Sequence, residues 1–359
     1  MLEKFQLTER EVKKEFSGKA PDNLPEKFAA TVAQWFRRVK EDFPWRGTSD
    51  PYAVLVSEMM LQQTQVGTVL AGGYYEKWMM QFPEVGALAV ADEEAVLKAW
   101  EGLGYYRRAR NLKRTAEQVR DFHGGIFPDT VEELQKLPGV GRYTAGAVLS
   151  FAFGKPAPIV DANVARVFAR LFDLREEIDS SQAQRQLWAW ASDLVPVSEV
   201  REYNAGLMEL GQKICTPSRP KCESCPVATW CACDQPENLP KKKIKRPVEN
   251  LKESVFFARR QDGKFLVERE TGARRTGLFR LPLTGEEATG WPVLLETKYC
   301  ITRYRVTLTC FAAPDGFCPP VETDDDRIWC LPEEAELLPV ATPYRKVLRK
   351  LLHEPTLDA

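Results

Sequence analysis

Four closely spaced cysteines have the residue type and spacing for metal chemistry. They are Cys215, Cys222, Cys225 and Cys231, arranged as Cys-x6-Cys-x2-Cys-x5-Cys. Thiolates so close in sequence can converge on one metal centre, and in a reducing compartment metal ligation is favoured over disulfides. On residue type alone zinc is the generic candidate, and scattered core cysteines are the alternative.

A glycine-rich turn is the second feature with chemical potential. Pro138-Gly139-Val140-Gly141-Arg142 lies between two segments of helical periodicity. Such a turn can present backbone N–H groups at the start of a helix, where an anion such as a phosphate is favoured. Twenty residues after Gly141, Asp161 begins an apolar helical run. Asp161 is therefore either a plain N-cap or a carboxylate whose charge the helix favours for a chemical role.

A second carboxylate lies in an apolar segment. Glu58 is part of Val54-Leu55-Val56-Ser57-Glu58-Met59-Met60-Leu61. Burial there would raise the pKa of its carboxyl group and make it a proton donor, whereas a solvated glutamate is the alternative. Two carboxyl groups whose pKa values are pushed apart by their surroundings can supply one acid and one ionised carboxylate.

These segments together resemble the helix-hairpin-helix DNA glycosylases, and more closely the MutY family of adenine glycosylases. Residues 137–144 and 160–163 are similar to the hairpin and the catalytic carboxylate of that superfamily. The cysteine spacing matches the iron–sulfur loop of endonuclease III and MutY, and four thiolates suffice for a [4Fe-4S] cluster. The resemblance thus implies a [4Fe-4S] cofactor on the four cysteines.

The resemblance also implies catalytic roles. Residues 57–64 are similar to the MutY segment that bears the glutamate proposed to protonate adenine, which implies that Glu58 is the acid. Asp161 would stabilise or briefly trap the oxocarbenium-like sugar, and Tyr143 and Asn163 would position the acid and the sugar. Strand-nicking relatives have a nucleophilic lysine where this chain has Tyr143, so hydrolysis that leaves an abasic site is implied.

A base inside a duplex is unreachable, so an enzyme of this kind has to flip the nucleotide out and fill the gap. The implied partner is double-stranded DNA containing a mismatch or lesion, bound by a monomer. For the aromatic residues, core packing is the alternative. The residues assigned to DNA contact are Gln62, Gln63, Thr64, Tyr105, Gly139, Val140, Gly141, Arg142, Thr302 and Arg303.

Composition limits the possible classes of protein. A chain of 359 residues with 44% hydrophobic residues favours two domains. A net charge of −1 argues against a strongly basic nucleic-acid binder, so DNA binding would depend on local patches such as 107–114 and 241–246. Neither a long apolar run nor a signal-like N-terminus is present, which predicts a cytoplasmic protein without membrane contact, nucleoid-associated in a bacterium.

Hydrophobic periodicity predicts helices from Phe28 to about residue 230, and short β-rich segments after that. The fold class expected is multi-domain: an all-α helix-hairpin-helix glycosylase domain with an iron–sulfur loop, then a smaller α+β MutT-like (Nudix-type) domain. The expected parts are a polar extension (1–26), the glycosylase domain (27–234) with its loop (215–231), a basic linker (235–250) and the MutT-like lesion-recognition domain (251–359). Expected helices are 52–68, 71–80, 92–100, 106–122, 130–137, 143–153, 161–172, 183–194, 202–214 and 342–352, and expected strands are 254–258, 264–268, 305–311 and 327–331.

The last part of the chain departs from the family. Residues 277–282 are similar to a Leu-Trp-Glu-Phe-Pro-like run of MutY, and no Nudix catalytic signature is present, so nucleotide hydrolysis is not expected. Ile301-Thr302-Arg303 stands where the family has Phe-Ser-His, and a guanidinium can donate hydrogen bonds but cannot accept them. Ala205 stands where the family has Gln or Glu. These changes leave the base-removal residues in place and put the lesion preference in question.

The sequence therefore predicts a monofunctional adenine DNA glycosylase that acts on adenine opposite 8-oxoguanine or guanine in base excision repair. One alternative is a glycosylase for another mismatched base, such as thymine opposite guanine. The others are a non-catalytic iron–sulfur DNA-binding protein and a zinc-stapled helical scaffold.

Overall fold

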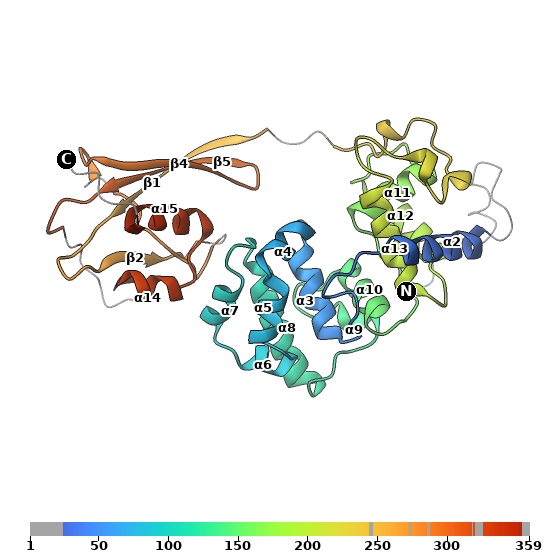
Figure 1. The fold of residues 1–359 in the computed structure, drawn as a ribbon, viewed down its shortest axis with the longest axis horizontal. Helices are drawn as coiled ribbons and strands as arrows, with labels where there is room; N and C mark the ends of the chain where they lie inside the picture. Colours follow the sequence, from blue (N-terminus) through green and yellow to red (C-terminus); the bar gives the residue numbers. More distant parts are fainter. Residues whose placement is uncertain are drawn as a thin grey trace. The chain divides into compact units, whose positions relative to one another are not determined.

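The computed structural model of the protein describes residues 24–243, 247–272, 275–285, 288–317, 319 and 326–353. The chain divides into two compact units, each built from two stretches of sequence (Figure 1). Unit 1 comprises Met1–Glu58 and Ile126–Ile244, and unit 2 comprises Met59–Gly125 and Lys245–Ala359. Most of the predicted N-terminal extension and part of the basic patch 241–246 lie outside the described residues.

Unit 1 is helical. The apolar stripe predicted from Phe28 is buried in one core with residues of α11, α12 and α13. Gly206 allows α13 to approach α2 closely, since a Cβ at that position would lie 2.7 Å from Val32 Cγ1. Its elements are α2 (Leu24–Val39), α9 (Val131–Leu134), α10 (Arg142–Phe151), α11 (Ala162–Leu171), α12 (Ser181–Leu194), α13 (Val200–Lys213) and the 3-10 turns η1 (Cys222–Ser224), η2 (Ala228–Trp230) and η3 (Pro236–Asn238).

The first stretch of unit 2 is also helical. The predicted helix 52–68 is wrong, because α3 (Pro51–Leu61) ends before a turn at residues 62–65 that contains neither glycine nor proline. Gln63 in this turn is left-handed, with φ 57°. None of the described helices is long and apolar enough to cross a membrane. The helices of this stretch are α4 (Val66–Gly72), α5 (Tyr74–Gln81), α6 (Val85–Val90), α7 (Glu93–Ala99) and α8 (Arg107–His123).

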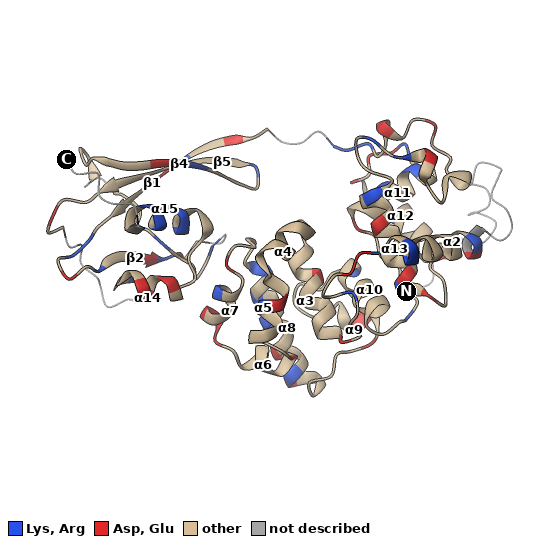
Figure 2. Ribbon diagram, viewed as in Figure 1, with Lys and Arg blue, Asp and Glu red and all other residues tan. Residues whose placement is uncertain are grey.

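The second stretch of unit 2 is α+β, as predicted. One sheet has the order β1-β5-β4, with β1 parallel and β4 antiparallel to β5, and the other has the order β3-β2-β6 with antiparallel pairs. Figure 2 shows acidic residues on α14 and basic residues on α15. The elements are β1 (Glu249–Phe257), β2 (Phe265–Arg269), β3 (Phe279–Arg280), β4 (Val293–Ile301), β5 (Tyr304–Ala312), β6 (Arg327–Cys330), α14 (Pro332–Leu337) and α15 (Thr342–His353).

The four predicted strands correspond to β1, β2, β5 and β6, whereas β3 and β4 were not predicted. β3 has only two residues. β4 lies at the edge of its sheet, and every residue along it is at least partly exposed. Because neither of its faces is buried, its sequence does not need the alternation of apolar and polar residues from which strands are predicted. Its last residue, Ile301, pairs with Tyr304 of β5, which places Thr302 and Arg303 in a two-residue hairpin turn.

Candidate active site

Glu58 is buried in α3, with only 6% of its surface exposed. The residues before and after it in the helix, Val54 to Met60, are buried as well, so the helix has no solvated face at this point. Burial raises the pKa of Glu58 to about 7, a hydrogen bond from Tyr143 opposes the rise, and the charge of Asp161 adds to it. A carboxyl group with this pKa is substantially protonated near neutral pH and can act as a general acid.

Tyr143 lies in the first turn of α10 and contacts the acid directly. Its hydroxyl donates a hydrogen bond to Glu58 Oε2 at 2.7 Å. Burial raises the pKa of Tyr143 well above its ordinary value, and the charges of Glu58 and Asp161 raise it further. The phenol therefore keeps its proton and orients the carboxyl group, and it offers no amine that could attack a sugar.

Asp161 is the N-cap of α11. Its Oδ1 accepts a hydrogen bond from the Val164 N–H at 2.7 Å, and its Oδ2 accepts one from Asn163 Nδ2 at 2.9 Å. Burial raises its pKa, while these bonds and the charge of Arg166 lower it. Asp161 is thus a helix cap whose charge also influences Glu58, and its chemical role stays a prediction.

The hairpin has the geometry that its sequence predicts. Gly139 has φ 77°, which favours glycine, and Val140 is buried beneath the turn. Gly141 is the N-cap of α10 and supplies no side-chain acceptor to the first-turn N–H groups. Arg142 is exposed, and its guanidinium lies 3.9 Å from the centre of the Trp188 ring. Binding of a DNA phosphate here stays a prediction.

The four cysteines of the predicted metal site lie together after α13. Burial raises the pKa of the Cys225 thiol to about 11, and the charges of the other three cysteines contribute to the rise, as expected for neighbouring sulfurs. Four neighbouring thiols are a donor set that can hold a [4Fe-4S] cluster, and zinc is the alternative that the same donors allow.

Two arginines of α11 bind the cysteine loop, and one of them, Arg166, also contacts Asn163 of the acid site; sequence reasoning missed both. Arg166 donates to Asn163 Oδ1 at 2.9 Å and to the carbonyl of Cys215 at 2.8 Å. Arg170, 1% exposed, donates to Cys215 Sγ at 3.3 Å and to the carbonyl of Thr216 at 2.8 Å. The available signal was a pair of arginines one helical turn apart in an otherwise apolar helix. Hydrogen bonds to cluster sulfurs and close cations are ways in which a protein tunes such a cofactor.

The remaining predicted residues lie in unit 2, except Ala205, which packs partly buried against the core of unit 1. Gln62, Gln63 and Thr64 form the turn after α3, and Tyr105 lies in the loop before α8 and is 49% exposed. Arg303, in the β4–β5 turn, pairs with Glu249 at 3.0 Å, and its guanidinium carbon lies 5.1 Å from the centre of the Tyr304 ring. The guanidinium is thus partly committed to a carboxylate of its own sheet.

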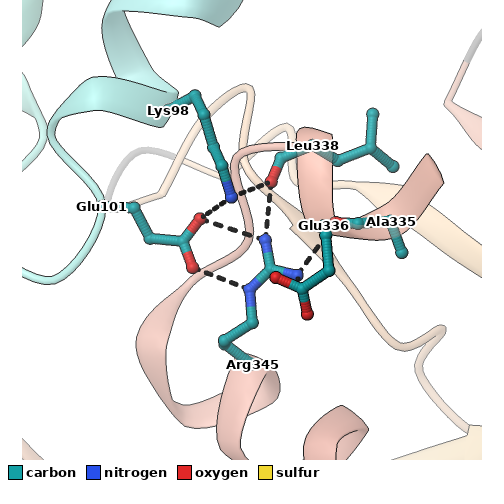
Figure 3. A network of polar contacts seen from close by, with 6 residues as sticks. All are labelled: Lys98, Glu101, Ala335, Glu336, Leu338 and Arg345. Atoms are coloured by element: carbon teal, nitrogen blue, oxygen red, sulfur yellow. Dashed lines mark hydrogen bonds and ion pairs between the residues drawn. The ribbon is translucent and has the colours of Figure 1, made fainter. Parts of the chain in front are cut away.

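Glu101, a partly buried glutamate of unit 2, has a different environment from Glu58 (Figure 3). Glu101 follows α7, and both of its oxygens accept hydrogen bonds from Arg345 of α15, at 2.7 and 3.0 Å. Lys98 adds a contact at 2.9 Å. Arg345 also donates to the carbonyls of Ala335 and Leu338. Burial acts to raise the pKa of Glu101, but Arg345 and Lys98 outweigh it, and the pKa is lowered.

Comparisons with known proteins give the class of this site. Residues 56–193 match the HhH-GPD superfamily of base excision DNA repair proteins, and residues 215–231 match the iron–sulfur binding domain of endonuclease III. The adenine DNA glycosylase of Buchnera aphidicola subsp. Acyrthosiphon pisum is 32% identical over 251 residues, which is 68% of this chain and 70% of that protein. The chain belongs to the adenine DNA glycosylase family.

Other relatives are matched over less of their length. The human adenine DNA glycosylase is 44% identical over 217 residues, 58% of this chain and 39% of that protein, so the chain spans about two fifths of this relative. A solved thermostable thymine-DNA glycosylase aligns with a TM-score of 0.52 at 33% identity, over 58% of this chain and 95% of that one. A non-covalent endonuclease III–DNA complex aligns with a TM-score of 0.50 at 25% identity, over 60% and 96%. These matches confirm the predicted family, helical fold and iron–sulfur loop.

Proposed function

We propose that the protein is a monofunctional DNA glycosylase that hydrolyses the N-glycosidic bond of adenine opposite 8-oxoguanine or guanine. The observation that carries the proposal is Glu58, a buried carboxyl group with a pKa near 7 that Tyr143 orients beside Asp161. Such a pair provides a proton for the base and a carboxylate for the sugar, as glycosidic bond cleavage requires. Membership of the adenine DNA glycosylase family supports adenine as the base.

The residues have separate tasks in this mechanism. Glu58 donates its proton to the flipped adenine as the bond between C1′ and the base nitrogen breaks, and the bonding electrons leave with the base. Positive charge then develops on the sugar, where the Asp161 carboxylate stabilises it. Water adds to C1′ and returns a proton to Glu58. Asn163 holds Asp161 Oδ2 and keeps its lone pairs oriented.

The iron–sulfur cofactor fits the cysteine loop beside the acid site as a structural element. Cys215, Cys222, Cys225 and Cys231 would hold it, and when bound a [4Fe-4S] cluster can stabilise the loop or exchange an electron. Arg166 joins the carbonyl of Cys215 to Asn163, which in turn contacts Asp161. Loss of the cluster would therefore disturb the position of Asp161, because Arg166 and Asn163 link Asp161 to the cysteine loop.

The partner in this proposal is double-stranded DNA with a mismatch or lesion, bound by a monomer in the cytoplasm, at the nucleoid of a bacterium. The hairpin around Gly141 would hold a phosphate, and Thr302 and Arg303 would face the base opposite the adenine. Support for the hairpin is an N-cap that uses no side-chain acceptor. Support for the β4–β5 turn is its partial exposure at the tip of a hairpin.

Single-turnover base release tests the proposal. Duplexes with adenine opposite 8-oxoguanine, adenine opposite guanine and thymine opposite guanine are incubated with excess protein, and abasic sites are revealed with alkali. We expect release from both adenine duplexes and no strand cleavage without alkali. Inactivity on both adenine duplexes would reject the proposal.

Thymine opposite guanine is the second candidate substrate because the thymine-DNA glycosylase structure aligns at 33% identity. Release from that duplex alone would favour it. Tight mismatch binding without any release would instead indicate a non-catalytic DNA-binding protein, and a preparation lacking iron and acid-labile sulfide would indicate the zinc-stapled scaffold.

A further inference from the structure

Arg108, near the start of α8, is buried although it carries a charge. Only 7% of its surface is exposed, and burial lowers its pKa to about 10, while Tyr105 partly opposes the change. The guanidinium lies 5.2 Å from the centre of the Trp100 ring. Its hydrogen-bond acceptors are the carbonyls of Met59, Met60, Gln62, Leu103 and Gly104 and the hydroxyl of Thr64.

These acceptors come from two loops and one helix end. Met59 and Met60 belong to the last turn of α3, where carbonyls lack helical partners and a cation is favoured. Gln62 and Thr64 belong to the turn that follows, and Leu103 and Gly104 belong to the loop before α8. The guanidinium of Arg108 thus links these two loops by hydrogen bonds.

Arg108 contacts each loop directly before a residue with a strained backbone conformation. Gln63 has φ 57° and Tyr105 has φ 48°, a left-handed conformation that is costly for residues with a side chain. Arg108 binds the carbonyl of Gln62, directly before Gln63, and the carbonyl of Gly104, directly before Tyr105. Strained conformations persist only where the surroundings over-determine them, and here Arg108 supplies much of that constraint.

Both strained residues are exposed at their loop tips. A polar and an aromatic side chain, on two loops that share one guanidinium, suit the opening of a base pair, because one can fill the gap and the other can stack on a base. A flexible loop would have to be ordered when DNA binds, and the entropy lost in that ordering would reduce the free energy available for opening the base pair.

We propose that Arg108 is a positioning residue that holds the Gln62–Thr64 turn and the Leu103–Tyr105 loop as one preformed element for extruding the target nucleotide. This inference rests on the proposed glycosylase function. It goes beyond that function because it assigns the geometry of the extruding element to a side chain that touches neither the base nor the sugar.

The test compares a paired with an unpaired adenine. Single-turnover base release is measured on adenine opposite 8-oxoguanine and on adenine opposite an abasic analogue, which needs no base pair to be opened. The variants are Arg108→Met, which removes the charge, and Arg108→Lys, which keeps the charge but cannot span all the acceptors. Arg120→Met is the matched control, since Arg120 is an exposed arginine of the same helix, also donates to a carbonyl, that of Ala89, and lies outside the basic patch 107–114.

We expect Arg108→Met to slow release from the paired substrate roughly 100-fold and from the unpaired one less than about 10-fold. Arg108→Lys should lie between Arg108→Met and the wild type, and Arg120→Met should stay within about 2-fold of the wild type on both. The fluorescence rise of a 2-aminopurine placed next to the adenine should fall in parallel with the paired rate.

Equal losses on the two substrates would overturn the inference, because they would indicate a general structural role. The inference would also be overturned if Arg108→Lys, with native circular dichroism, keeps the wild-type ratio of paired to unpaired rates. Failure of the proposed function looks different: the wild-type protein would then release no adenine from either substrate.

Discussion

Glu58 of unit 1 is buried and Glu101 of unit 2 is partly buried, yet their pKa values move in opposite directions. Burial raises the pKa of Glu58 to about 7, and a hydrogen bond from the neutral hydroxyl of Tyr143 opposes this rise. Burial acts on Glu101 as well, but Arg345 and Lys98 reverse its effect. Burial thus makes a carboxyl group costly to ionise. Without a neighbouring cation the group stays protonated to higher pH, and with one it ionises at lower pH.

Two cations of unit 1, Arg166 and Arg170, are committed to partners other than Glu58. Arg166 binds Asn163 and the carbonyl of Cys215, and Arg170 binds the cysteine loop. Burial raises the pKa of Asp161 as well, but three N–H donors and the cation of Arg166 oppose the rise. A cation that acts on Asp161 but not on Glu58 is what a pair of one acid and one carboxylate requires. The network around Glu101 instead joins α7 to α14 and α15.

The largest effect is expected on replacing the acid. Glu58→Gln preserves size but cannot deliver a proton, so single-turnover release of adenine opposite 8-oxoguanine should fall by about 10²- to 10⁴-fold. Binding of the same duplex, measured by fluorescence anisotropy, should change little. Glu101→Gln is the matched control, and a comparable loss of rate there would remove the distinction between the two glutamates.

The next effect is on stability. Arg345→Met leaves Glu101 with Lys98 alone, so the free energy of unfolding at pH 7 should fall by about 1–3 kcal/mol in urea. Adding Glu101→Gln should recover part of this loss, as a double-mutant cycle would show. Because the pKa of Glu101 is lowered, the pair's contribution is present above the unfolded value near 4.5 and is lost as the pH falls below it. Additive losses in the double variant would contradict the pairing.

A smaller effect is expected at Tyr143. The hydrogen bond from its hydroxyl lowers the pKa of Glu58, so Tyr143→Phe should raise that pKa. The rate would fall by about 10-fold because the carboxyl group is no longer oriented, while its decline with pH would begin at higher pH. A decline that moves to lower pH would show that the hydroxyl stabilises the protonated form instead.

The smallest effect is expected at Arg303. Its ion pair with Glu249 is solvent-screened, so Arg303→His should leave the free energy of unfolding nearly unchanged. An imidazole can accept as well as donate, so the ratio of release rates for adenine opposite 8-oxoguanine and opposite guanine should rise a few-fold. An unchanged ratio would mean that this turn does not read the opposite base.

The sequence was sufficient where chemistry depends on residue type and local spacing. The four cysteines and the apolar surroundings of Glu58 are local, and periodicity found most helices. Acceptors distant in sequence could not be predicted: Arg108 binds carbonyls of residues 59–62, and Arg345 binds Glu101. The break after Leu61 was missed because its left-handed residue is Gln63 instead of a glycine, and tertiary contacts hold it there.

The pH dependence of base release tests the role of Glu58 most directly. Single-turnover rates for adenine opposite 8-oxoguanine are measured from pH 5 to 9 for the wild type and for Glu58→Gln. If Glu58 acts as the protonated acid, the wild-type rate falls as the pH rises through about 7, and the residual rate of the variant lacks that step. A wild-type rate that is flat or rises through this range, or a variant that keeps the step, would contradict this role.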